Sequence, residues 1–369
     1  MLYREYGRSG KEVSLLGFGG MRFKNIDNHD ECVRIMVKAA EGGINYFDTA
    51  PGYFQTRSES VYGLAFKEFR KRKLPYYSAT KTFKSTEDDI RREIDEQLKR
   101  LDVPVIDFYH VWSIKTLEEW QARKKDGVVN ALRKLKSEGL IRHICVSSHL
   151  TQEEIADFLR EDVFEGVLFG YSAYNYRTRE KAFDAIRERG LGAAVMNPLG
   201  GGLIPQHPEL SAFLKRNEAE SPVERALCFL WDHKDISTTL VGFSTEAELD
   251  ESLAAMEKYS PRSDAELAAV KTANTASMEG ICTGCSYCRL CPQKIPVPKY
   301  MDVYNQYLLK KDPSLMEGRL RFHWGISPED PVDCIECGQC EAACTQHLDI
   351  IQRLKYISDK GRQHASTPR

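Results

Sequence analysis

The segment INYFDTAPGY, residues 44–53, joins a short apolar run to a polar turn that contains proline and glycine. The run predicts a buried strand over residues 44–50, because short apolar runs bounded by turn residues are typical of strands. The preceding residues 31–43 have apolar side chains at helical spacing and end in two glycines, which predicts a helix that stops before the strand. The chain therefore alternates helix and strand around this segment.

The same alternation runs through the first 260 or so residues. Further strands are predicted at residues 13–20, 76–82, 105–112, 141–148, 165–171, 191–197 and 236–242. Amphipathic stretches between the strands predict helices, among them residues 85–103, 128–138, 151–160, 177–189 and 222–233. Strict alternation indicates a parallel sheet, and eight such units in about 260 residues have the size of a (β/α)8 TIM barrel. The alternative is a doubly wound sheet, but the glycine loop GFGGM does not fit the G-x-G-x-x-G pattern of that fold.

The bulk composition is that of an ordinary globular protein. The 369 residues are 42% hydrophobic and 29% charged, and this length indicates two domains rather than one. A net charge of −2 without a basic stripe gives no sign of nucleic-acid binding. The first residues lack the layout of a signal peptide, and no apolar run approaches the roughly 18 residues of a membrane span. We therefore expect a soluble cytoplasmic protein.

Cysteines are concentrated near the C-terminus. Three of the eleven, Cys32, Cys145 and Cys228, are scattered and are expected to be small buried side chains. The other eight lie between Cys282 and Cys344. Because the cytosol is reducing, such a concentration indicates metal binding rather than disulfides.

The clustered cysteines form two runs. The first, CTGCSYCRLCP at residues 282–292, has the spacing C-x2-C-x2-C-x2-C-P, and the second, CIECGQCEAAC at residues 334–344, has C-x2-C-x2-C-x3-C. The bacterial ferredoxin pattern is C-x2-C-x2-C-x3-C-P. The first run is therefore one residue short, and the second has Thr345 in place of the proline. Two evenly spaced runs favour two [4Fe–4S] clusters, with two zinc sites as the alternative because C-x2-C pairs also bind zinc.

The ligand sets of the two clusters are expected to interleave, because in two-cluster ferredoxins the fourth cysteine of a run ligates the other cluster. The first predicted set is Cys282, Cys285, Cys288 and Cys344. The second predicted set is Cys334, Cys337, Cys340 and Cys291. The predicted domains are the barrel over residues 1–262, a linking helix over 263–280 and a small, mostly helical ferredoxin-like domain over 281–369.

In a (β/α)8 barrel the chemistry lies at the C-terminal ends of the strands. The second predicted strand ends in FDTAPGY, residues 47–53, and the third ends in SATKT, residues 78–82. With these motifs in this order, residues 1–260 resemble the aldo/keto reductases. The resemblance implies carbonyl reduction with Asp48, Tyr53 and Lys81 as catalytic residues.

The chemistry of these three residue types is consistent with that role. Carbonyl reduction needs a hydride donor and an acid that protonates the new alkoxide. The pKa of a free tyrosine is near 10, and a nearby ammonium lowers it because the positive charge favours the phenolate. Tyr53 is therefore the expected acid, Lys81 the residue that tunes it and Asp48 the residue that holds Lys81.

The fourth catalytic position departs from the family pattern. The family has D-x-Y-x-x-H at the end of strand four, and residues 107–109 match its opening, but the histidine position falls on Trp112. His110, two residues earlier, points to the same side and lies about 6–7 Å nearer the barrel bottom, unless a bulge shifts it. His110 is a candidate active-site residue, and a core histidine beneath Trp112 is the alternative.

The resemblance also implies a nicotinamide cofactor, NAD(H) or NADP(H), across the barrel mouth. The residues that align with the family's nicotinamide contacts are Ser147, Ser148, Leu168 and Met196, where the family usually has Ser-Asn, glutamine and an aromatic residue. The residues expected at the phosphate end are Pro198, Leu199, Gly200, Gly242, Ser244 and Thr245. No Lys or Arg occurs between Lys234 and Lys258, and the acidic residues of this stretch favour NAD(H), because a 2′-phosphate needs a cation.

Three functional hypotheses follow. The first is a carbonyl or enone oxidoreductase with a small-molecule substrate, a nicotinamide, and clusters that are structural or serve a ferredoxin or flavoprotein partner. The second is an electron-transfer enzyme whose clusters deliver single electrons to a substrate in the barrel mouth. The third is a non-catalytic redox module. The loops expected to shape a substrate site, at residues 22–29, 113–127 and 200–221, carry no signature that identifies the substrate.

Overall fold

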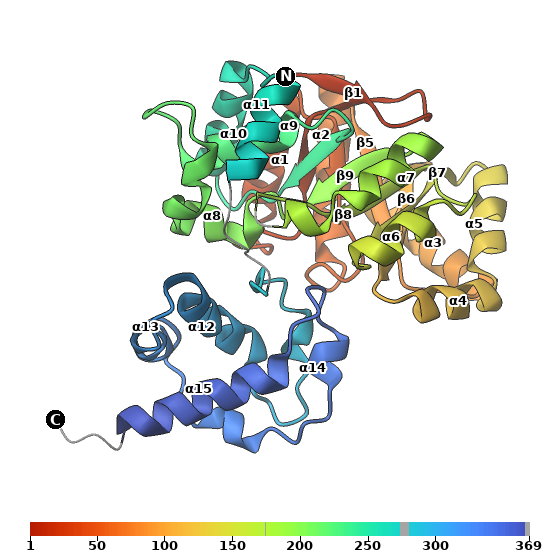
Figure 1. Ribbon diagram of the computed structural model, residues 1–369. Helices are drawn as coiled ribbons and strands as arrows, with labels where there is room; N and C mark the ends of the chain where they lie inside the picture. Colours follow the sequence, from red (N-terminus) through yellow and green to blue (C-terminus); the bar gives the residue numbers. More distant parts are fainter. Residues whose placement is uncertain (174, 274–279, 366–369) are drawn as a thin grey trace. The chain divides into compact units, whose positions relative to one another are not determined.

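The computed structural model describes residues 1–173, 175–273 and 280–365. The chain divides into two compact units, Met1–Ala276 and Ser277–Arg369 (Figure 1). Of the helices in the described ranges, none combines the length and the apolar composition that a membrane span requires.

The first unit is a closed barrel of parallel strands, as the alternating pattern predicts. Within the described residues, its strands in order around the barrel are β10 (Thr238–Val241), β3 (Leu16–Gly19), β4 (Tyr46–Asp48), β5 (Tyr77–Thr82), β6 (Ile106–Ile114), β7 (Ile141–Ser148), β8 (Gly166–Gly170) and β9 (Gly192–Met196). An antiparallel hairpin of β1 (Tyr3–Glu5) and β2 (Glu12–Ser14) precedes the barrel. The (β/α)8 prediction is confirmed, and the doubly wound alternative is excluded because the sheet closes on itself.

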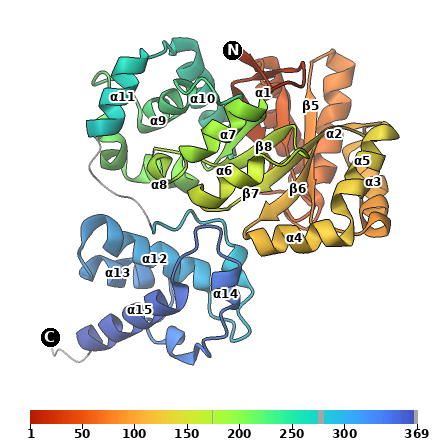
Figure 2. The ribbon, with the colours of Figure 1, turned by 45° about the vertical axis from the view of Figure 1, so that its right-hand side comes forward.

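Helices cover the outside of the barrel (Figure 2). They are α1 (His29–Glu41), α2 (Arg57–Arg72), α3 (Glu87–Leu101), α4 (Leu117–Asp126), α5 (Val128–Ser137), α6 (Gln152–Leu159), α7 (Lys181–Arg189), α8 (Leu203–Gln206), α9 (Pro222–Trp231), α10 (Glu246–Lys258) and α11 (Asp264–Ala273). The expectation of a loop over residues 113–127 is wrong, because α4 occupies most of that stretch. Thr116 caps α4 by accepting a hydrogen bond from the Glu119 amide, and the buried Trp120 anchors it.

The N-terminal end of the barrel is filled by a side chain from the hairpin region. The ring of Tyr6 is fully buried and lies 4.4 Å from the ring of Phe108, centroid to centroid. It also lies against Gly166 and Gly192, the first residues of β8 and β9, where no β-carbon would fit. Since this end is closed by packing, only the opposite end of the strands is left to build a site.

Helix α11 covers the stretch where a linking helix is expected, as far as residue 273. It is held on the barrel unit by the ion pairs Lys271–Glu180 and Lys234–Asp264, and Tyr176 donates a hydrogen bond to the Lys271 carbonyl. Residues 274–279 of the predicted linking helix lie outside the described residues.

The second unit is mostly helical. It contains α12 (Val297–Lys310), α13 (Ser314–Gly318), a π-helical turn (Arg319–Trp324), α14 (Gln339–Ala342) and α15 (Ile350–Ala365). Helices α12 and α15 pack against each other (Figures 1 and 2). Their apolar side chains form one core with several of the clustered cysteines, so the cysteine runs are part of the interior of this unit.

We expect Gly166→Ala to lower the free energy of unfolding by about 1–3 kcal/mol, the usual cost of overpacking a core. The added β-carbon would lie 2.3 Å from Cε1 of Tyr6, a ring that is fully buried. Gly170→Ala, at the other end of the same strand, is the control, since its β-carbon would lie 3.7 Å from Nδ2 of Asn175. Thermal unfolding followed by circular dichroism compares the two variants, and equal stabilities would contradict the proposed closure by Tyr6.

Candidate functional site

A buried ion pair lies at the C-terminal ends of β4 and β5. Nζ of Lys81 is 2.6 Å from both carboxylate oxygens of Asp48 and donates a further hydrogen bond of 2.8 Å to the Thr49 carbonyl. Asp48 is opposite Ala79 in the strand register, so Lys81 lies two residues further toward the barrel mouth. The side chains are 4% and 1% exposed, and the structure therefore brings together two of the residues that the sequence predicts as catalytic.

Burial and pairing act in opposite directions on this pair. Burial raises the pKa of the Asp48 carboxyl, and the Lys81 ammonium opposes the rise. Burial lowers the pKa of Lys81, and Asp48 opposes that fall. Removing one partner would leave an uncompensated buried charge, which is why the two residues depend on each other.

A second buried network supports Lys81 from outside the barrel. The carboxylate of Glu59, on α2, accepts hydrogen bonds of 2.7 Å from Thr80 Oγ1 and 3.0 Å from Gln97 Nε2. The same Gln97 nitrogen donates a bond of 2.9 Å to the Lys81 carbonyl. Glu59 and Gln97 were not identified from the sequence. The pattern that could have indicated them is a polar side chain on the buried face of each helix, Glu59 on α2 and Gln97 on α3.

Tyr53 lies on the turn between β4 and α2. The three residues that follow it, Phe54, Gln55 and Thr56, have φ values of 51°, 56° and 71°. Left-handed backbone costs L-residues about 1–2 kcal/mol each, so this turn is held by the packing around it. The half-buried Tyr53 ring has its centroid 5.3 Å from Nζ of Lys81. All three residues of the predicted catalytic set thus meet at one place.

His110 lies beside Lys81, its partner in the register of β5 and β6. The side chain is fully buried, Nδ1 is 3.3 Å from the Thr80 carbonyl, and Nε2 has no hydrogen-bond partner among the described residues. Burial and the Lys81 charge lower the pKa of His110 to about 3. The bulge in β6 follows Val111 and therefore leaves His110 in its regular position.

Trp112 is the residue of β6 that contacts Tyr53. The two rings meet edge to face, with centroids 5.6 Å apart and an interplanar angle of 89°. The opposite side of the indole stacks on Phe83 at 3.9 Å. Gly52 provides the space for this arrangement, because a β-carbon there would lie 2.5 Å from the indole Cη2. The fourth position of the family motif is thus occupied by an aromatic residue that packs on Tyr53, and His110 is buried two residues earlier on the same strand.

The residues aligned with nicotinamide contacts lie on neighbouring strands. Ser147 and Ser148 are buried at the end of β7, and Ser147 is opposite Leu168 of β8. The Ser148 hydroxyl accepts a hydrogen bond of 3.3 Å from the Leu150 amide, so it takes part in the local turn. Met196 ends β9 and is partly exposed. This set is brought to the same barrel end as Asp48 and Lys81.

The loop expected at the phosphate end has the conformation that its glycines permit. Pro198 is buried, Leu199 is partly buried, and residues Gly200 to Gly202 have φ values of 61°, 71° and 98°. Only glycine adopts such values in succession without strain. The second predicted segment, residues 242–245, leads directly into α10.

A glutamate already binds the start of α10. Thr245 caps the helix by accepting a bond from the Glu248 amide, while the Glu248 carboxylate accepts a hydrogen bond of 2.7 Å from the Ser244 amide. The Ser244 hydroxyl donates to the Arg22 carbonyl at 2.7 Å. The Ser244 amide, which a bound anion would use, therefore already donates to a carboxylate. This contact was not predicted from the sequence, although Glu248 follows the helix cap Thr245 by three residues.

The eight clustered cysteines fall into two groups that mix the two runs. Cys288 acts electrostatically on Cys282 and Cys285 of its own run and on Cys344 of the other. Cys334, Cys337 and Cys340 line one cavity together with Cys291 from the first run. Each group therefore contains cysteines of both runs, which is the mixing that the interleaved ferredoxin pattern predicts.

The first group is more deeply buried than the second. Cys282, Cys288 and Cys344 are buried, whereas Cys337 is exposed. Burial raises the pKa of Cys282 and of Cys288 to about 12, so metal binding at these thiols must displace protons.

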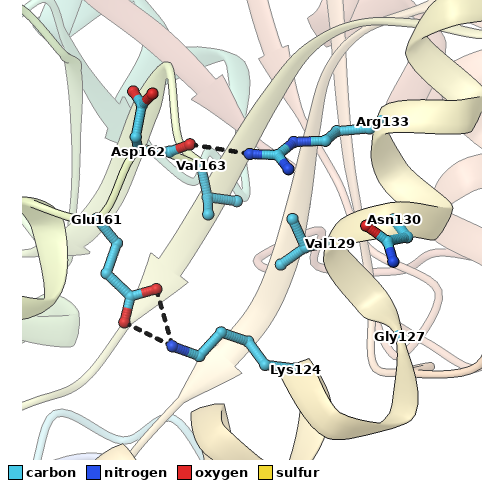
Figure 3. Close-up of a pocket in the computed structure, with 8 residues that line it drawn as sticks. All are labelled: Lys124, Gly127, Val129, Asn130, Arg133, Glu161, Asp162 and Val163. Carbon is cyan, nitrogen blue, oxygen red and sulfur yellow. Dashed lines mark hydrogen bonds and ion pairs between the residues drawn. The ribbon is translucent and has the colours of Figure 1, made fainter.

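A separate pocket lies outside the barrel, between α5 and the segment that leads into β8 (Figure 3). Its cations are already paired: Lys124 binds both carboxylate oxygens of Glu161, at 2.9 and 3.0 Å, and Arg133 donates to the Asp162 carbonyl at 3.2 Å. None of the predicted site residues lines this pocket, so the barrel mouth remains the candidate active site.

Double cysteine variants test the interleaved grouping. Because Cys282 and Cys344 belong to one group, we expect their double alanine variant to lose one cluster and keep the other, with about half of the iron retained. The matched variant of Cys282 and Cys291 should perturb both clusters, although both of its residues lie in the first run. Iron and sulfide analysis with electron paramagnetic resonance separates these outcomes. The opposite pattern would show that each run holds its own cluster.

Comparison with known proteins agrees with this geometry. Residues 15–275 match the model of the aldo/keto reductase family, and residues 281–348 match that of the 4Fe-4S dicluster domain. L-galactose dehydrogenase of Arabidopsis thaliana is 28% identical over 284 residues, which cover 69% of this chain and 87% of the relative. NADH-specific methylglyoxal reductase of Escherichia coli (strain K12) is 25% identical over 209 residues, covering 50% of this chain and 62% of the relative. The holo form of aldo-keto reductase AKR11C1 from Bacillus halodurans is similar in structure, with a TM-score of 0.64 at 25% identity over 74% of this chain and 96% of that chain. The chain therefore belongs to the aldo/keto reductase family and carries a 4Fe-4S dicluster domain after its barrel.

Proposed function

We propose that the barrel reduces the carbonyl group of a small molecule to an alcohol, with Tyr53 as the acid. The observation that carries the proposal is the buried Asp48–Lys81 pair, with Nζ of Lys81 5.3 Å from the centroid of the Tyr53 ring. Two relatives are named for reactions of a small dicarbonyl and of a sugar, which supports a small carbonyl compound as the substrate class.

The three residues divide the chemistry between them. A nicotinamide, when bound at the barrel mouth, would be the source of the hydride for the carbonyl carbon. Tyr53 gives its hydroxyl proton to the carbonyl oxygen, so that the C=O double bond becomes a C–O single bond with one new C–H bond and one new O–H bond. The Lys81 ammonium stabilises the phenolate that remains on Tyr53, and Asp48 keeps the ammonium charged and fixed inside the barrel. Burial strengthens these interactions, since water does not screen them.

His110 and Trp112 take positioning roles in this scheme. With a pKa of about 3, His110 is neutral at physiological pH and adds no second cation beside Lys81. Trp112 contacts the Tyr53 ring edge to face and covers the strand end that bears His110. Trp112 is buried between this contact and its stacking on Phe83, which fixes the indole beside the proposed acid.

The residues that would hold a dinucleotide are those at the ends of β7 to β10 and at the start of α10. They include Ser147, Ser148, Met196, Pro198, Leu199, Gly200, Gly242, Ser244 and Thr245. Glu248 lies on the Ser244 amide, so it would repel an added 2′-phosphate but could accept a hydrogen bond from a ribose hydroxyl. This arrangement favours NAD(H), and one relative is named as NADH-specific.

A second candidate function is single-electron delivery from the clusters to a substrate in the barrel mouth, with a ferredoxin or flavoprotein as the external donor. Three observations favour it. Ser148 and Leu168 stand where the family usually has asparagine and glutamine, and the Glu248 carboxylate accepts a hydrogen bond from the Ser244 amide. Each cluster moves one electron while a nicotinamide moves two as hydride, so the two candidates differ in how electrons enter.

Replacing Tyr53 by phenylalanine tests the acid role. We expect kcat for reduction of small aldehydes to fall by about 100- to 10,000-fold, the usual contribution of a general acid, while the Kd for NADH stays unchanged. Tyr3→Phe, which removes an exposed hydroxyl bonded to the Gly43 carbonyl, is the control. The anaerobic holo-protein is assayed by NADH oxidation. Unchanged turnover of the Tyr53 variant would refute its assignment as the acid. The second candidate function would be supported if the protein binds no nicotinamide and its clusters are reduced by dithionite.

The identity of the dinucleotide has its own test. We expect NADH to bind at least tenfold more tightly than NADPH, because the Glu248 carboxylate opposes a 2′-phosphate. Glu248→Gln should bring the Kd values for NADH and NADPH closer together by improving NADPH binding. Glu251→Gln, which removes a carboxylate seven residues after Ser244 in the sequence, is the control. Fluorescence titration of the purified protein measures both affinities. Equal affinities in the unaltered protein would contradict the role of Glu248.

A further inference from the structure

The residue after the last cysteine departs from the ferredoxin pattern. Thr345 stands where that pattern has proline, and its side chain is 1% exposed. A buried hydroxyl needs a hydrogen-bond partner, because leaving it without one costs free energy. The partners of Thr345 therefore indicate what the substitution adds to the site.

The Thr345 hydroxyl lies between an amide and a sulfur. Nε2 of Gln346 is 3.4 Å from Oγ1 of Thr345 and also donates a bond of 3.1 Å to the Thr345 carbonyl. On the other side, Oγ1 is 3.5 Å from Sγ of Cys285. Since the Gln346 amide donates to the hydroxyl oxygen, the hydroxyl hydrogen is left for the sulfur. The three groups form a chain in which each bond polarises the next.

The direction of the last bond is fixed when Cys285 ligates a cluster. A thiolate has no hydrogen and only accepts, so Thr345 must be the donor. Two backbone amides also point at sulfurs of the same group: the Gly284 amide donates to Cys282 and the Leu348 amide to Cys344, each at 3.4 Å. Hydrogen bonds to the sulfurs are one of the factors that set the potential of an iron–sulfur cluster.

Arg353 adds a positive charge to the same side of the unit. It donates a hydrogen bond of 2.6 Å to the Gly280 carbonyl and acts electrostatically on Cys282 and Cys344. A cation and hydrogen-bond donors both favour the reduced state, because reduction adds negative charge to the cluster and its ligands.

We propose that the Thr345 hydroxyl, oriented by Gln346, raises the reduction potential of the cluster held by Cys282, Cys285, Cys288 and Cys344. The replacement of proline by threonine thus makes this cluster an easier electron acceptor than it would be without the hydroxyl. The inference depends on the grouping of the cysteines and not on carbonyl reduction, so it is tested without nicotinamide or substrate.

The test compares Thr345→Val, which keeps the shape and removes the hydroxyl, with Thr345→Ser, which keeps the hydroxyl. The full-length holo-protein is reduced stepwise with dithionite, and each cluster is followed by electron paramagnetic resonance. We expect the valine variant to make one-electron reduction of one cluster about tenfold less favourable, which is about 59 mV lower in potential. The serine variant should keep the potential of the unaltered protein, and the other cluster should keep its potential in both variants.

Several results would overturn the proposal. Equal potentials in the valine variant and the unaltered protein would do so, and so would an equal shift of both clusters. If the valine variant does not assemble both clusters, the Gln346→Leu variant is compared with the unaltered protein instead. This variant keeps the Thr345 hydroxyl and removes the amide that orients it. A smaller shift in the same direction is expected there, and no shift would overturn the proposal. Failure of the cysteine grouping shows separately, in the iron content of the double cysteine variants.

Discussion

The buried ion pair between Asp48 and Lys81 is the interaction on which the candidate active site depends. Two charges in a dry interior are costly unless each has its partner and its hydrogen bonds. The barrel meets this condition by placing the two residues on adjacent strands, with Nζ of Lys81 within 2.6 Å of both Asp48 oxygens. Glu59 and Gln97 hold the strand that carries Lys81 from the opposite side. The left-handed turn that follows Tyr53 accompanies the placement of its ring beside this fixed cation.

The aromatic residues around Tyr53 give this member of the family a distinct site. Trp112 stacks on Phe83 and meets Tyr53 edge to face, and Gly52 leaves room for the indole. His110 is buried next to Lys81 and is neutral. The candidate site therefore combines a buried charged pair with neighbouring aromatic side chains.

The cysteine domain links two sequence segments that are about 40 residues apart. Cys291 lines a cavity with cysteines of the second run, and Cys344 acts electrostatically on Cys288 of the first, so the two runs meet in the folded unit. Cluster assembly is then coupled to the folding of this unit, as it is for other metal sites whose ligands are separate in the unfolded chain. The unequal burial of the two groups gives the two predicted cluster sites different surroundings, and solvent exposure is one of the factors that set a cluster's potential.

The sequence by itself determined the barrel, the family and the residue types of both sites, because hydrophobic period, strand–helix alternation and cysteine spacing are local features. It missed α4, whose cap at Thr116 is local but whose anchor Trp120 depends on packing. Only the tertiary structure decided that Trp112 meets Tyr53, that Glu248 binds the Ser244 amide and that Thr345 meets Cys285. These contacts depend on side-chain direction and on the approach of distant segments, which spacing along the chain does not specify.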